Sequence, residues 1–280
     1  MTLKQALQHA RQILQSHSIE NASLTAEVLL RHTLNLSRVQ LFQVIDRELK
    51  PDQEKTFQSV IQRHLEGEPV AYITGHKEFY GIDFYADPRA LIPRPETELL
   101  VEKALELART QGISTAADIG TGCGAIAIAL ALKLPQVKIY ATDISASALE
   151  LAFDNCRQHK VHDRVRLLSG DLLEPLPEPV DLVIANLPYV RESDIDISCS
   201  LSYEPRPALD GGADGLYQIR RFCVQAAGKV NPGGAILLEF GEGQGEAVTA
   251  LLHSGFPSAR IEVIKDLAGL ARAACVILSQ

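Results

Sequence analysis

The chain has 280 residues, of which 46% are apolar and 22% are charged, so it can bury a substantial core and is not expected to be disordered. The formal charge is -8, from 35 acidic and 27 basic residues, and no run of Lys and Arg stands out. Because enzymes that bind duplexes need a basic face, this balance argues against DNA or bulk RNA as the substrate.

Five cysteines lie apart from one another, without a CxxC pair or a histidine cluster at zinc-ligand spacing. We interpret them as reduced, mostly buried small residues; they are Cys123, Cys156, Cys199, Cys223 and Cys275. The first residues lack the apolar core of a signal peptide, and no stretch approaches the ~18 uninterrupted apolar residues of a membrane span. A cytoplasmic, monomeric protein is expected.

Residues 1–70 repeat a helical pattern four times, with Thr2 and Ser37 as possible caps and Pro51 at the start of the fourth segment. The four apolar stripes are Leu3, Ala6, Leu7, Ala10, Ile13 and Leu14; Val28, Leu29, Leu30 and Leu34; Val39, Phe42, Val44, Ile45 and Leu49; and Phe57, Val60, Ile61 and Leu65. The segment holds eight acidic and eight basic residues and no catalytic constellation. It is predicted to be a small helical bundle, either a packing domain or a holder of a macromolecular substrate.

Residues 71–90 are predicted to link this bundle to a second domain over 91–280. Alternation begins at Ala71 and runs to about Tyr85, with aromatic residues around Gly81, which suggests a short β-hairpin. A helix should follow at Pro95, because proline suits a first turn.

Beyond Thr115 the chain alternates strands and helices, as an open α/β sheet does. The strand candidates are 116–119, 138–144, 165–171, 181–186, 235–240, 259–264 and 274–279. The last two have no long helix between them, so they should form an antiparallel hairpin at the sheet edge. The predicted class is α/β, with a seven-stranded mixed sheet flanked by helices.

A glycine-rich turn follows the first of these strands. Gly120, Thr121, Gly122, Cys123 and Gly124 lie between strand and helix, where glycine allows close backbone approach and the helix N-terminus favours an anionic or carboxylate group. By itself this pattern equally fits a plain strand-to-helix turn. We interpret Cys123 as a small filler rather than a reactive thiol.

Acidic residues end the next two strands. Asp143 comes 23 residues after Gly120, where a carboxylate can accept hydrogen bonds from the ribose hydroxyls of an adenosine-containing cofactor, although a helix cap is the alternative. Asp171 and Leu172 could meet an adenine, or could be turn residues. These features fit a nicotinamide enzyme as well as a methyltransferase.

The fourth strand ends in Asn186, Leu187, Pro188 and Tyr189, at the carboxyl end where open α/β sheets bind ligands. An amide nitrogen is a poor nucleophile, so its NH₂ group must be oriented by two acceptors. The Asn186 side-chain oxygen and the Leu187 carbonyl can supply these acceptors. Tyr189 can lie flat on the planar amide, and Pro188 restricts Leu187 to extended conformations. The alternative is an ordinary polar strand end followed by a proline turn.

The order DIGTGCG, ATDI and ANLPYV resembles the class I Rossmann-like methyltransferases of the amino-group type, whose signature is (D/N)-P-P-Y. The stretches GEPVAYITGHKEFYG, LIPRPETELLVE, YEPRPALDGGADGL and LLEFGEGQGEAV resemble the peptide chain release factor glutamine methyltransferases. In that family the substrate is the GGQ glutamine of class-1 release factors, methylated on its side-chain nitrogen.

The resemblance implies that Gly120 to Gly124 and Asp143 hold S-adenosylmethionine, that Asn186 to Tyr189 hold the glutamine, and that the N-terminal bundle grips the release factor. Asp171, Leu172 and Asn186 are further candidates for cofactor contact. Arg94, within IPRPETE at the expected cofactor entrance, could meet a carboxylate or be a surface cation. The chain departs from the pattern at Leu187, where relatives have proline, and at Leu172, where relatives can carry an aromatic residue.

Three rival functions remain open. Adenine in nucleic acid, or a glutamine of a ribosomal protein, offers the same donor geometry as the release-factor glutamine. A non-catalytic adaptor would bind the cofactor and dock a translation factor without moving a methyl group. A nicotinamide dehydrogenase would need an acid-base residue that the later strands do not supply.

Overall fold

The structure, a computed structural model, describes residues 1–195 and 201–280. The chain divides into two units, Met1–Gly75 and His76–Gln280. Each unit has its own hydrophobic core.

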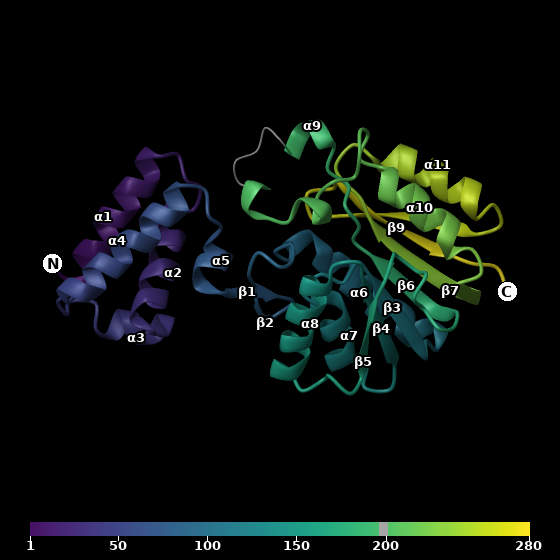
Figure 1. The fold of residues 1–280 in the computed structure, drawn as a ribbon, viewed down its shortest axis with the longest axis horizontal. Coiled ribbons are helices and arrows are strands. Elements are labelled where there is room, and N and C mark those ends of the chain that lie inside the picture. The colour runs from purple at the N-terminus through teal and green to yellow at the C-terminus, as the bar shows by residue number, and fades with distance from the viewer. Residues whose placement is uncertain (196–200) are drawn as a thin grey trace. The chain divides into compact units, whose positions relative to one another are not determined.

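Helices make up the N-terminal unit, drawn in purple and blue in Figure 1. They are α1 (Leu3–Ser16), α2 (Ala22–Leu34), α3 (Arg38–Gln43), α4 (Pro51–Leu65) and α5 (Val70–Thr74). Thr2 and Ser37 begin α1 and α3 as capping boxes, and Pro51 occupies the first turn of α4. The predicted helical bundle is thus confirmed.

The third predicted apolar stripe was wrong at Val39 and Phe42, whereas Val44 and Ile45 do pack against the core. Helix α3 spans six residues and buries Leu41, whereas Val39 and Phe42 are 67% and 50% exposed. One and a half turns can direct only a narrow face at the core, and Leu41 occupies it. Leu49 does join the core, but from the segment between α3 and α4.

The hairpin begins later than its alternation suggested. Residues Val70–Thr74 are helical, because Pro69 fixes the N-cap and Gly75 ends the helix in a left-handed conformation with φ 75°. The hairpin consists of β1 (His76–Phe79) and β2 (Ile82–Tyr85), paired antiparallel.

Within residues 76–195 and 201–280, seven further strands form one sheet in the order β5-β4-β3-β6-β7-β9-β8. They are β3 (Thr115–Ile119), β4 (Lys138–Asp143), β5 (Val165–Ser169), β6 (Val180–Ala185), β7 (Val230–Glu239), β8 (Arg260–Lys265) and β9 (Ala271–Ile277). Strands β3 to β7 are parallel, and β9 is antiparallel to both β7 and β8. The predicted mixed sheet and its terminal hairpin are confirmed, with β8 at the edge.

Helices cover both faces of the sheet (Figure 1). One core contains residues of α6 (Glu98–Gln111), α7 (Ala125–Lys133) and α8 (Ala146–Gln158). The other contains residues of α10 (Tyr217–Ala226) and α11 (Gly245–Gly255). Alternate residues of the central strands enter the two cores, as expected for a sheet buried on both faces.

The described residues also form short helices, which are η1 (Pro95–Thr97), α9 (Glu192–Ile195), η2 (Leu201–Tyr203) and η3 (Arg206–Ala208). The 3-10 helix η1 leads directly into α6, which confirms the helix start predicted at Pro95. In the described part of the chain, every helix is too short or too polar to cross a membrane.

The sheet register aligns the ends of β3, β4 and β6 at its carboxyl edge. Ile119 pairs with Thr142 on β4 and with Ala185 on β6, so Gly120 follows at the level of Asp143 and Asn186. Strand order reverses at β3, where β4 lies on one side and β6 on the other. Such a switch point is where open α/β sheets bind ligands.

Candidate active site

The glycine-rich turn between β3 and α7 is fixed to the neighbouring strand. Gly120, Gly122 and Gly124 have φ of 72°, 56° and 86°, in the left-handed region that favours glycine. The amides of Gly120 and Thr121 both donate to the Thr142 carbonyl at 2.9 Å. The turn therefore approaches the sheet edge closely and holds a defined shape.

Gly124, the N-cap of α7, is also required by packing. A Cβ there would lie 3.0 Å from Ile128 Cδ1 and 3.3 Å from Ala152 Cβ. Because Ala152 belongs to α8, this glycine lets the start of α7 pack against its neighbouring helix.

Asp118 lies beneath the turn and was not predicted as a site residue. Its Oδ2 accepts hydrogen bonds from Thr121 Oγ1 at 2.6 Å and from the Ala127 amide at 3.1 Å. Its Oδ1 is buried and has no hydrogen-bond partner among the residues that the structure describes. Burial raises the pKa of Asp118 to about 7. A buried carboxylate oxygen without a partner at this point fits a ligand that carries an ammonium group or another strong donor.

Asp143 is held by the backbone on both sides. Its Oδ2 accepts from the Gly122 amide at 2.8 Å and its Oδ1 from the Ser145 amide at 2.9 Å. Ser145, rather than Asp143, caps α8, because its hydroxyl accepts from the Ala148 amide. Burial raises the pKa of Asp143, and these amides oppose the shift. Each oxygen keeps capacity for a further donor, such as a ribose hydroxyl.

Asp171 and Leu172 have local partners. The Asp171 carboxylate forms an ion pair with Arg221 and accepts from Gln225 Nε2 at 3.0 Å, which ties the segment after β5 to α10. The Leu172 carbonyl accepts from Thr142 Oγ1 at 2.8 Å, and Leu172 has a left-handed φ of 49°. These contacts are typical of turn residues. The predicted contact of Asp171 and Leu172 with an adenine stays a prediction.

Asn186 is oriented by a partner from another element. Its Nδ2 donates to Thr97 Oγ1 at 2.9 Å, at the end of η1. Within residues 1–195 and 201–280, neither Asn186 Oδ1 nor the Leu187 carbonyl accepts a hydrogen bond. The two acceptors predicted from the sequence therefore have no hydrogen-bond donor among the described residues.

Tyr189 is fixed at both its backbone and its hydroxyl. Its carbonyl accepts from Gln244 Nε2 at 3.0 Å, and its hydroxyl donates to Glu239 Oε1 at 3.2 Å. A Cβ on Gly215 would lie 2.4 Å from that carbonyl, so only glycine permits this approach. Burial raises the pKa of Tyr189, and the Glu239 carboxylate adds to the shift.

The four predicted motif residues line one pocket of about 120 Å³. Its lining consists of Leu91, Arg94, Asn186, Leu187, Pro188, Tyr189, Val190, Leu201, Ala208 and Leu209. Pockets that hold drug-sized ligands have volumes of roughly 300–1,000 Å³, so this one suits a single side chain. Arg94 meets the carboxylate of Glu204, which is buried and also accepts from the Ile92 amide at 3.0 Å.

Sequence reasoning missed Asp118, Thr97, Glu239 and Gln244. Asp118 stands in the quoted DIGTGCG stretch, so its position next to the glycines was the available signal. The others come from segments 50 to 89 residues distant from the motif residues they bind. They stand in the quoted stretches LIPRPETELLVE and LLEFGEGQGEAV, but nothing in those stretches indicates which motif residue each one contacts.

The cysteines agree with their interpretation as buried thiols. Cys123 is 3% exposed, and burial raises its pKa to about 12, which makes it unreactive. Cys156, Cys223 and Cys275 are also buried and free, whereas Cys199 lies outside the described residues.

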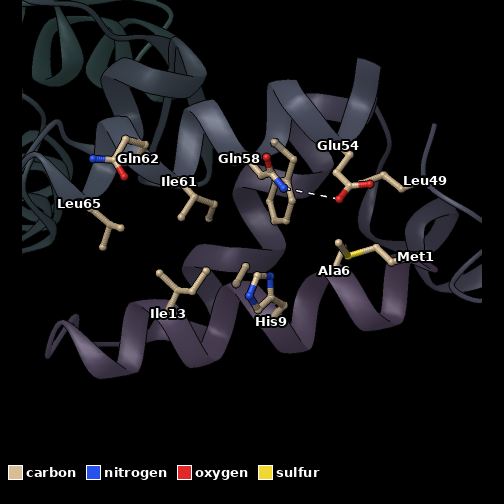
Figure 2. Close-up of a pocket in the computed structure, with 12 residues that line it drawn as sticks. Met1, Ala6, His9, Ile13, Leu49, Glu54, Gln58, Ile61, Gln62 and Leu65 are labelled. Atoms are coloured by element: carbon tan, nitrogen blue, oxygen red, sulfur yellow. Dashed lines mark hydrogen bonds between the residues drawn. The ribbon is translucent and has the colours of Figure 1, made fainter. Parts of the chain in front are cut away.

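A larger cavity, of about 220 Å³, lies within the N-terminal unit between α1 and α4. Figure 2 shows Ile13 and Ile61 on its walls, with Gln58 and Glu54 joined by a hydrogen bond near one end. Apolar side chains dominate it, and no carboxylate cluster or glycine turn accompanies it. This lining is suited to binding an apolar side chain, not to catalysing a reaction.

Residues 5–75 match the family model described as the PrmC N-terminal domain, and residues 95–202 match the methyltransferase small domain. A release factor glutamine methyltransferase from Moorella thermoacetica is 42% identical over 274 residues, which is 97% of each chain. One from Bacillus anthracis is 38% identical over 281 residues, covering 97% of this chain and 98% of the relative.

Among solved structures, a methyltransferase from Pyrococcus furiosus aligns with a TM-score of 0.53 at 19% identity, covering 72% of this chain and 91% of that one. A ribosomal protein L11 methylase from Lactobacillus delbrueckii subsp. bulgaricus aligns with a TM-score of 0.50 at 24% identity, covering 69% and 83%. These two likenesses support the fold.

Proposed function

The chain belongs to the release factor glutamine methyltransferase family, and on this premise we propose that it methylates the side-chain nitrogen of the GGQ glutamine in class-1 release factors. The methyl donor in this proposal is S-adenosylmethionine.

The main support for the proposal is a pair of acceptor oxygens at the end of β6 that have no donor among the described residues. A carboxamide NH₂ group has two protons, and Asn186 Oδ1 and the Leu187 carbonyl can each accept one of them. This arrangement fixes the plane of the amide and draws electron density toward nitrogen as the new N–C bond forms. The nitrogen loses one of these protons as it gains the methyl group.

The glycine-rich turn, Asp118 and Asp143 have polar atoms that could bind S-adenosylmethionine. Asp118 Oδ1 could accept from the cofactor's ammonium group, and Asp143 could accept from its ribose hydroxyls. When bound, the cofactor supplies a methyl group activated by a positively charged sulfur. The glycine turn would let the backbone approach it without side-chain interference.

The size and charge of the site support a protein substrate. A pocket of about 120 Å³ suits a side-chain carboxamide better than a nucleotide. The net charge of -8 gives no electrostatic advantage for a phosphate backbone. The cavity of the N-terminal unit has apolar walls with His9, Gln58 and Gln62 among its lining, which suits a grip on the release factor.

Peptide mapping by mass spectrometry tests the proposal directly. A release factor incubated with enzyme and S-adenosylmethionine should gain one methyl group on the GGQ glutamine, and a release factor carrying Asn at that position should gain none. Cofactor binding without transfer would favour the adaptor, and methyl groups on adenine in RNA or DNA would favour the nucleic-acid rival. Either result would overturn the proposal.

A further inference from the structure

Glu239 ends β7 beside the motif, and the transfer chemistry above does not use it. Ala185 pairs with Leu238, so Asn186 and Glu239 follow side by side at the carboxyl edge of the sheet. Glu239 is 2% exposed. Ionising a carboxyl group that is buried this deeply is costly. A buried acid next to a ligand site is therefore a candidate for a functional role.

Glu239 is bound directly by Tyr189 and lies next to Thr97, the partner of Asn186. The Tyr189 hydroxyl donates to Glu239 Oε1 at 3.2 Å. Asn186 Nδ2 donates to Thr97 Oγ1, so the Thr97 hydroxyl keeps its own proton for another acceptor. The Thr97 hydroxyl is also the strongest of the hydrogen-bonding groups that lower the pKa of Glu239. A relay can therefore run from Asn186 through Thr97 to the Glu239 carboxylate.

The surroundings of Glu239 allow it to change charge near neutral pH. Its Oε2 is buried and has no partner at hydrogen-bond distance in the described part of the chain. Of the charged groups nearby, Glu96 raises the pKa of Glu239, whereas Arg94 pairs with Glu204. Burial raises the pKa of Glu239 to about 7, and the polar groups of Thr97, Tyr189 and Asn186 oppose this shift.

We propose that Glu239 is a positioning residue whose carboxylate form holds Thr97 and Tyr189, and through Thr97 turns the Asn186 oxygen toward the substrate amide. In its neutral form, Glu239 remains an acceptor but loses its negative charge, so it holds the Thr97 and Tyr189 hydroxyls more weakly. The bond from Asn186 Nδ2 to Thr97 is then weakened, because the Thr97 hydroxyl is no longer polarised by a charged acceptor. This inference rests on the proposed function.

Glu239→Gln tests the inference, because it keeps the size of the side chain and removes the negative charge. Initial rates of release-factor methylation would be measured from about pH 5.5 to 9 for both proteins. The wild-type kcat should rise with pH through about 7, whereas the variant should be low and flat, about tenfold below wild type at the alkaline end. KM for the release factor should change less than kcat, since the relay orients a group rather than supplying a contact.

Glu242→Gln is the matched control, since this glutamate lies in the same segment and its side chain is 69% exposed. It should keep the wild-type pH profile. Calorimetric binding of S-adenosylhomocysteine should be the same for wild type and both variants, which provides a readout independent of turnover. A Glu239→Gln enzyme with the wild-type pH profile, or with lost product binding, would overturn the inference.

Thr97 offers a second pair of variants should Glu239→Gln fold poorly. Thr97→Val removes the relay hydroxyl and should lower kcat about as much as Glu239→Gln, whereas Thr97→Ser should restore it. Equal rates in the two Thr97 variants would contradict the relay. A wild-type enzyme that methylates no release factor would refute the proposed function instead, so the two failures remain distinct.

Discussion

At the scale of single residues, the site combines neutral acceptors with buried acids. Asn186 and Leu187 present uncharged oxygens that can orient a carboxamide, while Asp118 and Glu239 each keep one buried oxygen without a partner in the described residues. Such unpartnered oxygens are rare in folded proteins and usually have a functional reason. Here both lie at the carboxyl edge of the sheet, where a ligand can satisfy them.

Asn186→Ala should abolish methylation and leave cofactor affinity within about tenfold, because the lost contact acts mainly in the transition state. Asn231→Ala provides the same substitution at the opposite end of β7, where Asn231 donates to Asp181 at 2.7 Å. Radiolabel transfer to a release factor and calorimetry with S-adenosylhomocysteine measure the two quantities. Wild-type turnover in Asn186→Ala would refute its catalytic role.

Glu239 should also make stability depend on pH. Its pKa is about 7 in the folded protein and 4.5 ordinarily, so between these values the folded state binds more protons than the unfolded state. Stability contributed by this group therefore falls as pH rises from about 4.5 to 7, by about 3 kcal/mol in total. Urea unfolding should show Glu239→Gln gaining stability relative to wild type over this window. If the unfolding free energies of the two proteins changed with pH in the same way, the raised pKa of Glu239 would be contradicted.

At the scale of elements, the glycine turn and the strand ends act together. The turn is anchored through Thr142 on β4, and a Cβ on Gly120 would lie 3.3 Å from Leu187 Cδ2. The expected cofactor loop and the expected substrate motif thus touch through Leu187, which is 2% exposed. Leu187 therefore has a packing role beside the turn.

Gly124→Ala should destabilise the protein more than Gly112→Ala. Both glycines have positive φ, of 86° and 67°, and share a backbone cost of roughly 1–2 kcal/mol. Only the Gly124 Cβ meets neighbours, whereas nothing lies within 4 Å at Gly112, so Gly124→Ala should cost roughly 1–3 kcal/mol more. Unfolding free energies of the two variants give the comparison. Equal losses would show that packing at the start of α7 is loose.

At the scale of the whole molecule, the two units contain different groups. Residues Met1–Gly75 have a complete helical core but no cofactor-type groups, while His76–Gln280 contain the sheet, the turn and the motif. A unit with its own core can recognise a partner without disturbing the reaction centre. We therefore assign the grip on the release factor to the N-terminal unit as part of the proposed function.

A chain beginning at His76 should keep cofactor affinity within about threefold and lose at least about tenfold in kcat/KM for an intact release factor. A short free peptide containing GGQ should be methylated at similar rates by both chains, because it cannot use the N-terminal unit. Steady-state kinetics with the two substrates measure the contrast. Unchanged kcat/KM for the release factor would remove the N-terminal unit from substrate recognition.

The sequence by itself determined the seven strands, the terminal hairpin, the turn at Gly120 to Gly124 and the motif at Asn186 to Tyr189. These features are local: strand periodicity, glycine placement and proline restriction operate over a few residues and can be followed along the chain. The errors were local too. The stripe of α3 and the early start of the hairpin depended on apolar residues in short segments, where helix and strand patterns are hard to tell apart.

Only the tertiary structure decided which groups surround the motif. Thr97 binds Asn186 across 89 residues of sequence and Glu239 binds Tyr189 across 50. Asp171 forms an ion pair with Arg221 from α10, a partner 50 residues away in the sequence. Glu239 is brought to the motif by the parallel register of β6 and β7, and Thr97 by the hydrogen bond that joins η1 to Asn186. The sequence of each segment carries no signal for the other, because the contact exists only after the sheet has formed.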